Sequence, residues 1–229
     1  MVNVNVKFNI ENRAFVIPGQ KLGSGIIKYD LNCFRENNSI FSSVIGLAKI
    51  EEGKVKVIPS SGIYIPKEDD VVIGVVIRKH INYLDLDINS PYECILINEE
   101  KANNVKSSNK SNENFNILNK FEVGDVLSVK ILSVNEVNFS QAVKPWKLET
   151  GLILEVNPKR VPRIIGKKKS MLNLIKEKTK CRVIVGQNGR IWIKGEKANF
   201  VERVIKKIVK EAQTQGLTDR IEKLLNTTS

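Results

Sequence analysis

The sequence is poor in the residues that support metal or redox chemistry. It has three cysteines and one histidine among 229 residues. Cys33, Cys94 and Cys181 are isolated and widely spaced, so they offer neither a disulfide framework nor a CxxC zinc knuckle. We expect buried free thiols, no bound metal and no cofactor.

Catalytic motifs are also missing. The sequence has no HExxH, no GxSxG and no phosphate loop. Glycines cluster between residues 19 and 25, but no Lys-Ser/Thr pair and no helical pattern follows them, which favours turns. The acidic pairs at 69–70 and 85–87 lie in or beside ordinary strand patterns. We therefore expect no catalytic residues and no enzyme.

Long hydrophobic runs are absent too. No run reaches the about 18 apolar residues that a membrane span needs, and residues 1–13 lack the basic-then-apolar order of a signal peptide. The hydrophobic content of 41% can still fill the cores of two or three small domains. We expect a globular protein of the cytoplasm with no membrane contact.

What the chain does have is positive charge, concentrated near one end. Residues 144–229 contain 21 Lys and Arg against 8 Asp and Glu, a net charge of +13, whereas residues 1–143 contain 16 against 17. Such asymmetry favours a polyanionic partner, because binding releases condensed counterions. A solvated, solubilising surface is the alternative explanation.

The first segment, residues 1–66, reads as an all-β domain. Short β-type runs alternate with turn residues, as in "RAFVIPGQ" and "EEGKVKVIPSSGIYIP". The tetrapeptide "EEGK" predicts a hairpin in which Gly53 takes a positive φ.

The second segment, residues 67–143, has the strand spacing of a small barrel of about five strands. Alternation places Leu84, Leu86 and Ile88 in its core and puts Tyr83 with two aspartates on the other face. Residues 98–119 contain 8 Asn in 22 positions, too polar a composition to bury much surface, so a mobile loop is expected there.

The third segment, residues 144–229, follows the order β-α-α-β-β-α. A short helix is predicted near 161–165, and a second helix begins after Ser170, which is predicted to be its N-cap. Asn188-Gly189 predicts a hairpin. Apolar residues at helical spacing predict another helix over 196–213, and "TDRIEKLL" a last short one. The fold class is therefore multidomain, mainly β with an α+β C-terminal part.

Several segments resemble one known family. "RIIGKKKSMLNLI" at the joint between two helices resembles a type I KH domain, and "DVVIGVV…LDLDINSPYECIL…FEVGDVLSVKILSV" resembles a five-stranded S1 barrel of the OB type. Together with "VIPGQKLGSG" and "VPRIIGKKKSM", they occur in the order found in the S1/KH cap subunit of the archaeal exosome.

This resemblance implies a non-catalytic RNA-binding subunit. In this family three cap subunits sit on a hexameric ring of RNase PH-type subunits, sometimes mixed with a sibling that has a zinc ribbon, and S1 barrels surround the entry pore for single-stranded RNA. The N-terminal β domain is the part expected to dock on the ring. A stand-alone S1/KH factor of transcription or translation is the competing interpretation.

The family's RNA-clamping loop reads Gly-x-x-Gly, and here it is altered. Gly166 keeps the first glycine, but Lys169 replaces the second. Lys167, Lys168 and Lys169 form a triple cation beside a helix N-terminus, which favours phosphate. We predict a non-specific electrostatic contact, with a tight clamp as the alternative. Three arginines are further contact candidates or else exposed solubilising charges: Arg160, Arg163 and Arg182.

On the barrel, Tyr83 is a candidate to stack on a base, with Lys79 and His80 near it on a turn to contact phosphate. The aspartates on the same face argue against this site. Of the two tryptophans, Trp146 is predicted to wedge the S1 and KH parts together, and Trp192 to be a packed hairpin residue.

Overall fold

The computed structural model describes residues 7–30, 32–98, 117–212, 214 and 216–226. The chain forms two compact units, Met1–Gly62 and Ile63–Ser229. Most of the predicted loop at 98–119 lies outside the described residues. The prediction of domain boundaries after residues 66 and 143 stays a prediction, although the last barrel strand continues to Lys147.

The first unit consists of strands, as predicted. One four-stranded sheet has the order β1-β3-β6-β5 and the other the order β2-β7-β8-β4. Their shared core contains seven buried residues, among them Leu22, Ile40 and Val55. The strands are β1 (Lys7–Phe8), β2 (Phe15–Val16), β3 (Lys21–Ser24), β4 (Lys28–Tyr29), β5 (Cys33–Glu36), β6 (Ser39–Ser42), β7 (Gly46–Glu51) and β8 (Lys54–Pro59).

Strands β7 and β8 form the predicted hairpin, and Gly53 in its turn has a φ of 75°. The sheet that contains them has an apolar outer face. Phe15 pairs with Leu47 and Leu47 with Ile58, so the three side chains form a row across β2, β7 and β8. Their neighbours Val16, Ala48 and Val57 are buried, whereas Phe15 and Ile58 are 54% and 50% exposed. Alternation thus leaves an apolar row facing away from the core.

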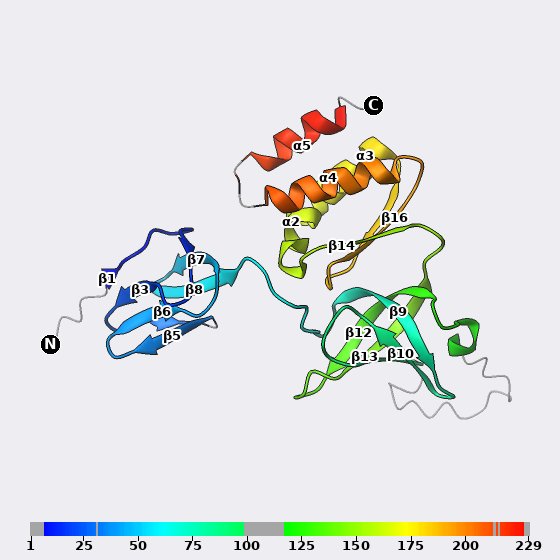
Figure 1. The fold of residues 1–229 in the computed structure, drawn as a ribbon, viewed down its shortest axis with the longest axis horizontal. Coiled ribbons are helices and arrows are strands. Elements are labelled where there is room, and N and C mark those ends of the chain that lie inside the picture. The colour runs from blue at the N-terminus through cyan, green and yellow to red at the C-terminus, as the bar shows by residue number, and fades with distance from the viewer. Residues whose placement is uncertain (1–6, 31, 99–116, 213, 215, 227–229) are drawn as a thin grey trace. The chain divides into compact units, whose positions relative to one another are not determined.

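The second unit begins with a closed five-stranded barrel, as predicted, in the order β10-β11-β13-β12-β9 (Figure 1). Leu84, Leu86 and Ile88 are buried in its core, which confirms the predicted alternation. Among the described residues, the short 3-10 helix η1 (Ile117–Lys120) precedes the last two strands. The strands are β9 (Val71–Lys79), β10 (Tyr83–Asp87), β11 (Cys94–Ile97), β12 (Val126–Val134) and β13 (Ser140–Lys147).

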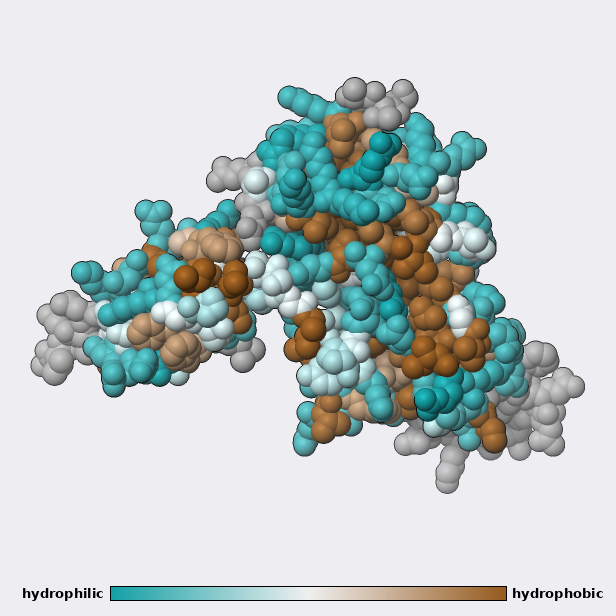
Figure 2. All heavy atoms as spheres, in the orientation of Figure 1, coloured by the Kyte–Doolittle hydropathy of each residue, from teal (hydrophilic) through white to brown (hydrophobic). Residues whose placement is uncertain are grey.

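The rest of this unit has the predicted β-α-α-β-β-α order. Its sheet has the order β14-β16-β15, and the helices cover one face of it (Figure 1). The outward surfaces of these helices are largely hydrophilic in Figure 2. The elements are β14 (Leu152–Glu155), η2 (Pro158–Arg160), α2 (Val161–Ile165), η3 (Lys167–Lys169), α3 (Ser170–Thr179), β15 (Arg182–Val185), β16 (Arg190–Lys194), α4 (Ala198–Lys210) and α5 (Leu217–Asn226).

A small apolar cluster joins the barrel to this sheet. Trp192 is 5% exposed and packs with Ile73 of β9 and with Leu148 of the linker after β13. Ile191 and Ile193 face the helices instead, so Trp192 alternates to the other face, as predicted. The prediction for Trp146 was wrong, because its side chain is 71% exposed and Trp192 takes the position between the two parts.

The predicted hairpin between β15 and β16 is present, but its connection is longer than an Asn-Gly turn. The connection consists of four residues, Gly186 to Gly189. Gly189 has a positive φ but Asn188 does not, whereas a two-residue Asn-Gly turn needs a positive φ at both. A Cβ on Gly186 would lie 2.3 Å from Oδ1 of Asn188 and 2.9 Å from the backbone nitrogen of Ile73. The glycine is required because the hairpin tip lies directly against the barrel.

Candidate nucleic-acid interface

The loop between α2 and α3 needs its first glycine. Gly166 has a φ of 74° and a ψ of 172°, and its N–H donates to the carbonyl of Pro162. A Cβ at this position would lie 2.8 Å from the backbone nitrogen of Met171. Both the left-handed backbone and the close approach of the next helix therefore exclude a side chain.

Lys169, which stands where the family has its second glycine, has the backbone conformation that favours glycine. Lys169 has a φ of 63° and a ψ of 17°, in the left-handed region, and Lys168 also has a positive φ. A lysine held there costs about 1 kcal/mol in backbone strain. Lys169 occupies the N-cap position of α3, so the prediction that Ser170 is the N-cap was wrong: Ser170 is the first helical residue.

The loop presents cations without partners. Lys167, Lys168 and Lys169 are exposed, and no ion pair with another described residue holds them. The first turn of α3 contains no acidic residue and no side-chain cap, although the N–H of Ser170 already donates to the carbonyl of Lys167. The lysine charges thus lie at the positive end of the helix dipole, which is a suitable arrangement for phosphate.

The three candidate arginines are placed differently. Arg160 and Arg163 immediately precede the loop, on η2 and α2, so they belong to the same basic stretch. Arg182 is exposed on β15, whose neighbouring residue Val183 packs against the helices. Alternation therefore directs Arg182 to the opposite face of the sheet from the loop.

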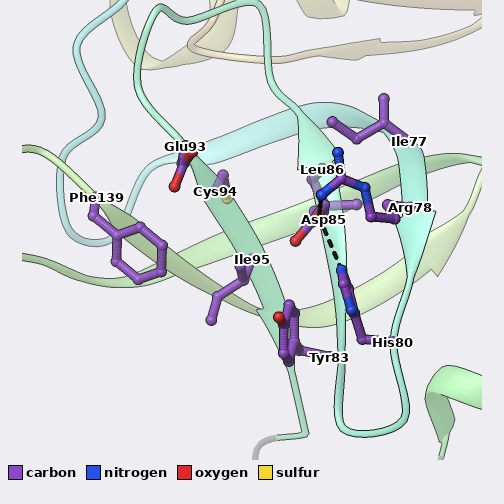
Figure 3. A pocket seen from close by; sticks show the side chains of 10 residues that line it. All are labelled: Ile77, Arg78, His80, Tyr83, Asp85, Leu86, Glu93, Cys94, Ile95 and Phe139. Atoms are coloured by element: carbon purple, nitrogen blue, oxygen red, sulfur yellow. Dashed lines mark hydrogen bonds and ion pairs between the residues drawn. The ribbon is translucent and has the colours of Figure 1, made fainter.

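Two of the barrel candidates, His80 and Tyr83, line a cavity of about 520 Å³ (Figure 3). The rings of His80 and Tyr83 stack with their centroids 4.3 Å apart. Lys79 does not line the cavity, because its Nζ lies 2.8 Å from Oε1 of Glu122 in an ion pair. The structure thus brings two of the three predicted residues together and directs the third elsewhere.

Arg78 lines this cavity and was missed from the sequence, because β9 continues through Lys79 where a turn was predicted. The feature that could have identified Arg78 is its position opposite Asp85 on β10, which pairs opposite charges across the two strands. Its Nη1 lies 3.7 Å from Oδ2 of Asp85, and Nε2 of His80 lies 3.1 Å from the same oxygen. Arg78 therefore offsets the acidic charge that counted against this site.

The second aspartate of β10 is engaged at the junction with the KH-like part. Arg190, 7% exposed, donates from Nη2 to Oδ2 of Asp87 at 2.6 Å and from Nε to Oε1 of Glu155 at 2.9 Å. Burial alone would raise the pKa of Asp87, but hydrogen bonds from Arg190 and from the N–H of Asn89 outweigh it and lower this pKa. Both aspartates of the barrel face are therefore compensated by cations.

No cluster of three or more His, Cys, Asp or Glu side chains suited to a metal occurs in the part of the chain that the structure describes. The three cysteines are free, and burial raises the pKa of the Cys94 thiol to about 11. None of the helices among the described residues is long and apolar enough to cross a membrane.

Comparisons with known proteins agree with this architecture. The profile of the KH domain family matches residues 151–199. The chain is 38% identical to the exosome complex component Rrp4 of Methanothermus fervidus, over 94% of this chain and 96% of the relative. It is 40% identical to the same component of Methanobrevibacter smithii, over 95% and 72%. A crystal structure described as an exosome complex RNA-binding protein matches with a TM-score of 0.58 and 32% identity, over 72% and 97% of the two chains.

Proposed function

The chain belongs to the family of the archaeal exosome component Rrp4, and on this basis we propose that it is a non-catalytic cap subunit of an exosome. It captures the 3′ ends of single-stranded RNA and guides them to the pore of a hexameric ring of RNase PH-type subunits in the cytoplasm. Three such caps sit on each ring, some of them replaced by the zinc-ribbon sibling. The ring, and not this chain, degrades the RNA.

The observation that carries the RNA-binding part is the loop after α2. Its three exposed lysines have no acidic partner among the described residues, and the first turn of the helix that follows has no acidic residue and no side-chain cap. Contacts of this kind hold phosphates without reading bases. The stacked His80 and Tyr83 beside Arg78 supply a second candidate surface, suited to an unpaired base and its phosphate.

The docking part rests on the first unit. The row of Phe15, Leu47 and Ile58 leaves apolar area on the outer face of a sheet, where a free-standing factor would have no use for it. Exposed apolar residues of this kind are typical of surfaces that bind another protein. This favours a ring-bound subunit over a stand-alone S1/KH factor.

The proposal is tested by mixing the purified chain with an RNase PH-type hexamer from a related archaeon. We expect co-elution on size exclusion and tighter capture of labelled single-stranded RNA by the mixture than by the ring alone. With phosphate and Mg²⁺, the isolated chain should leave RNA intact. Processive phosphorolysis by the chain alone would contradict a non-catalytic role, and RNA binding without co-elution would favour the stand-alone factor.

A further inference from the structure

A second hollow lies at the β15 edge of the KH-like sheet. Its volume is about 330 Å³, within the range of about 300–1,000 Å³ that small-ligand sites occupy. It is formed where the end of β13 and the linker after it pass β15, β16 and the side of α3. The lining residues used below are Trp146, Leu148, Lys176, Arg182, Ile184 and Trp192.

The inner wall of this hollow is apolar and fixed. Trp192 and Leu148 are 5% and 6% exposed and pack together with Ile184. Nε1 of Trp192 donates to the carbonyl of Glu149 at 2.9 Å, which satisfies the one polar group of the indole. A Cβ on Gly151 would lie 2.6 Å from this Nε1, so the linker passes close to the ring. The wall is therefore already formed before any ligand arrives.

The outer wall is an exposed aromatic ring. Trp146 is 71% exposed, although it belongs to a barrel strand. At this position β13 pairs only with Ser128 of β12, because its pairing with β11 ends at Ala142. The ring thus stands at the rim of the hollow without packing in the barrel core. Solvent-exposed aromatic rings of this kind are the usual platforms for unpaired bases.

The available charge around the hollow is positive. Lys176 is half-buried on α3 and Arg182 is exposed on β15, and neither makes an ion pair with another described residue. Glu149 is the acidic residue of the lining, and Lys194 pairs with it; this hydrogen bond lowers the pKa of Glu149. The charge of Arg182 also lowers the pKa of Glu149, and the lining holds more cations than this one carboxylate, so an approaching ligand meets a net positive charge.

We propose that this hollow binds one unpaired nucleotide of RNA. The base stacks on Trp146 against the apolar wall, and its phosphate contacts Lys176 and Arg182. The proposal rests on the proposed RNA-binding function and adds a site to it, because no residue of the lysine loop lines the hollow.

The two tryptophans make the test direct, because only Trp146 is exposed. Titration of the full chain with oligouridylate should quench tryptophan fluorescence, and Trp146→Phe should abolish the quenching while it keeps most of the affinity. Inorganic polyphosphate, which has no bases, should bind through the lysines without quenching. Trp146→Ala should weaken oligouridylate binding by about 5-fold or more, the lower end of the loss of one stacked base. Val137→Ala, at a comparable exposure of 72% on the barrel, is the matched control and should change nothing.

Failure of this site is distinguishable from failure of the proposed function. Normal oligouridylate affinity in Trp146→Ala, with no quenching in the unaltered chain, would overturn the nucleotide site and leave RNA binding in place. Equal quenching by polyphosphate would also overturn it, since the signal would then report charge and not a base. Absence of any RNA binding by the unaltered chain would overturn the proposed function together with this site.

Discussion

Asn188 holds the backbone of Ile73 on both its donor and its acceptor side. Its Oδ1 accepts from the N–H of Ile73 at 3.3 Å, and its Nδ2 donates to the carbonyl of Ile73 at 2.8 Å. The same Nδ2 donates to the carbonyl of Ile88 at 2.8 Å. These residues lie 115 and 100 positions apart in the sequence. One buried carboxamide therefore fixes the hairpin of the KH-like domain to strand β9 and to the residue that follows β10.

Replacing Asn188 by Ala should destabilise the second unit by about 2–4 kcal/mol, because buried backbone groups lose their partners. Urea unfolding followed by circular dichroism measures the change. Gln187→Ala is the matched control, since its backbone N–H still donates to Val71, and we expect a change within about 0.5 kcal/mol. Equal stability of the two variants would show that the carboxamide does not hold the junction.

The ion pair of Asp87 with Arg190 should make the free energy of unfolding decrease at acid pH. The pKa of Asp87 is lowered in the folded chain from its ordinary value of 3.8. Its contribution is therefore complete above about pH 4 and is lost as the pH falls through the folded-state pKa. We expect the difference in unfolding free energy between the unaltered chain and Asp87→Asn to be constant from pH 5 to 7 and to shrink below pH 4. A difference that grows on acidification would contradict this pairing.

Lys169→Gly separates backbone strain from RNA contact. Lys180 is a matched control because it is also exposed and left-handed, with a φ of 56° at the C-cap of α3. Both Lys→Gly changes should stabilise the chain by about 0.5–1 kcal/mol as the strain is relieved. In a charge-driven loop, Lys169→Gly binds short single-stranded RNA slightly more weakly, whereas Lys180→Gly binds it as before. Tighter binding by Lys169→Gly at two salt concentrations would mean that Lys169 obstructs a competent clamp.

Removing all three loop lysines should change the salt dependence of RNA binding. If each lysine neutralises about one phosphate, the slope of log K against log salt should become flatter by about 2, at about 0.7 per contact on single strands. The loss should be similar for unrelated RNA sequences, since phosphate contacts carry no base information. Fluorescence anisotropy at four salt concentrations measures it. A sequence-dependent loss with an unchanged slope would point to base contacts in their place.

Ring docking should depend on the outer row of the first unit. Ile58→Asp places a charge in this row, and we expect co-elution with the hexamer to weaken by about 10-fold or more, as for a residue that carries much of an interface's binding energy. RNA affinity of the isolated chain should not change. Val137→Asp adds the same charge at an exposed site of the barrel and should leave docking intact. If Ile58→Asp still co-elutes as the unaltered chain does, the docking face lies elsewhere.

Local pattern was enough to predict most elements. Alternation in β10 and helical spacing in α4 are short-range signals, and the structure confirms both. Ser170 was predicted to be the N-cap because serine favours that position. In the structure Lys169, with its left-handed backbone, is the N-cap, so the helix begins one residue earlier than expected. The barrel site was predicted in part: the stacked His80 and Tyr83 lie close in sequence, whereas the partner of Lys79 is Glu122, 43 residues away.

The sequence by itself predicted the all-β first segment, the five-stranded barrel, the β-α-α-β-β-α order after it, the family and the position of the basic loop, because each depends on residues close together along the chain. Only the tertiary structure decided which tryptophan fills the junction, which cations neutralise the two aspartates, and what Asn188 does. These depend on the packing of the hairpin at 186–189 against the barrel about 100 residues earlier, and no local periodicity encodes that contact. The result leaves Trp146 exposed and Trp192 buried, although both stand in strands.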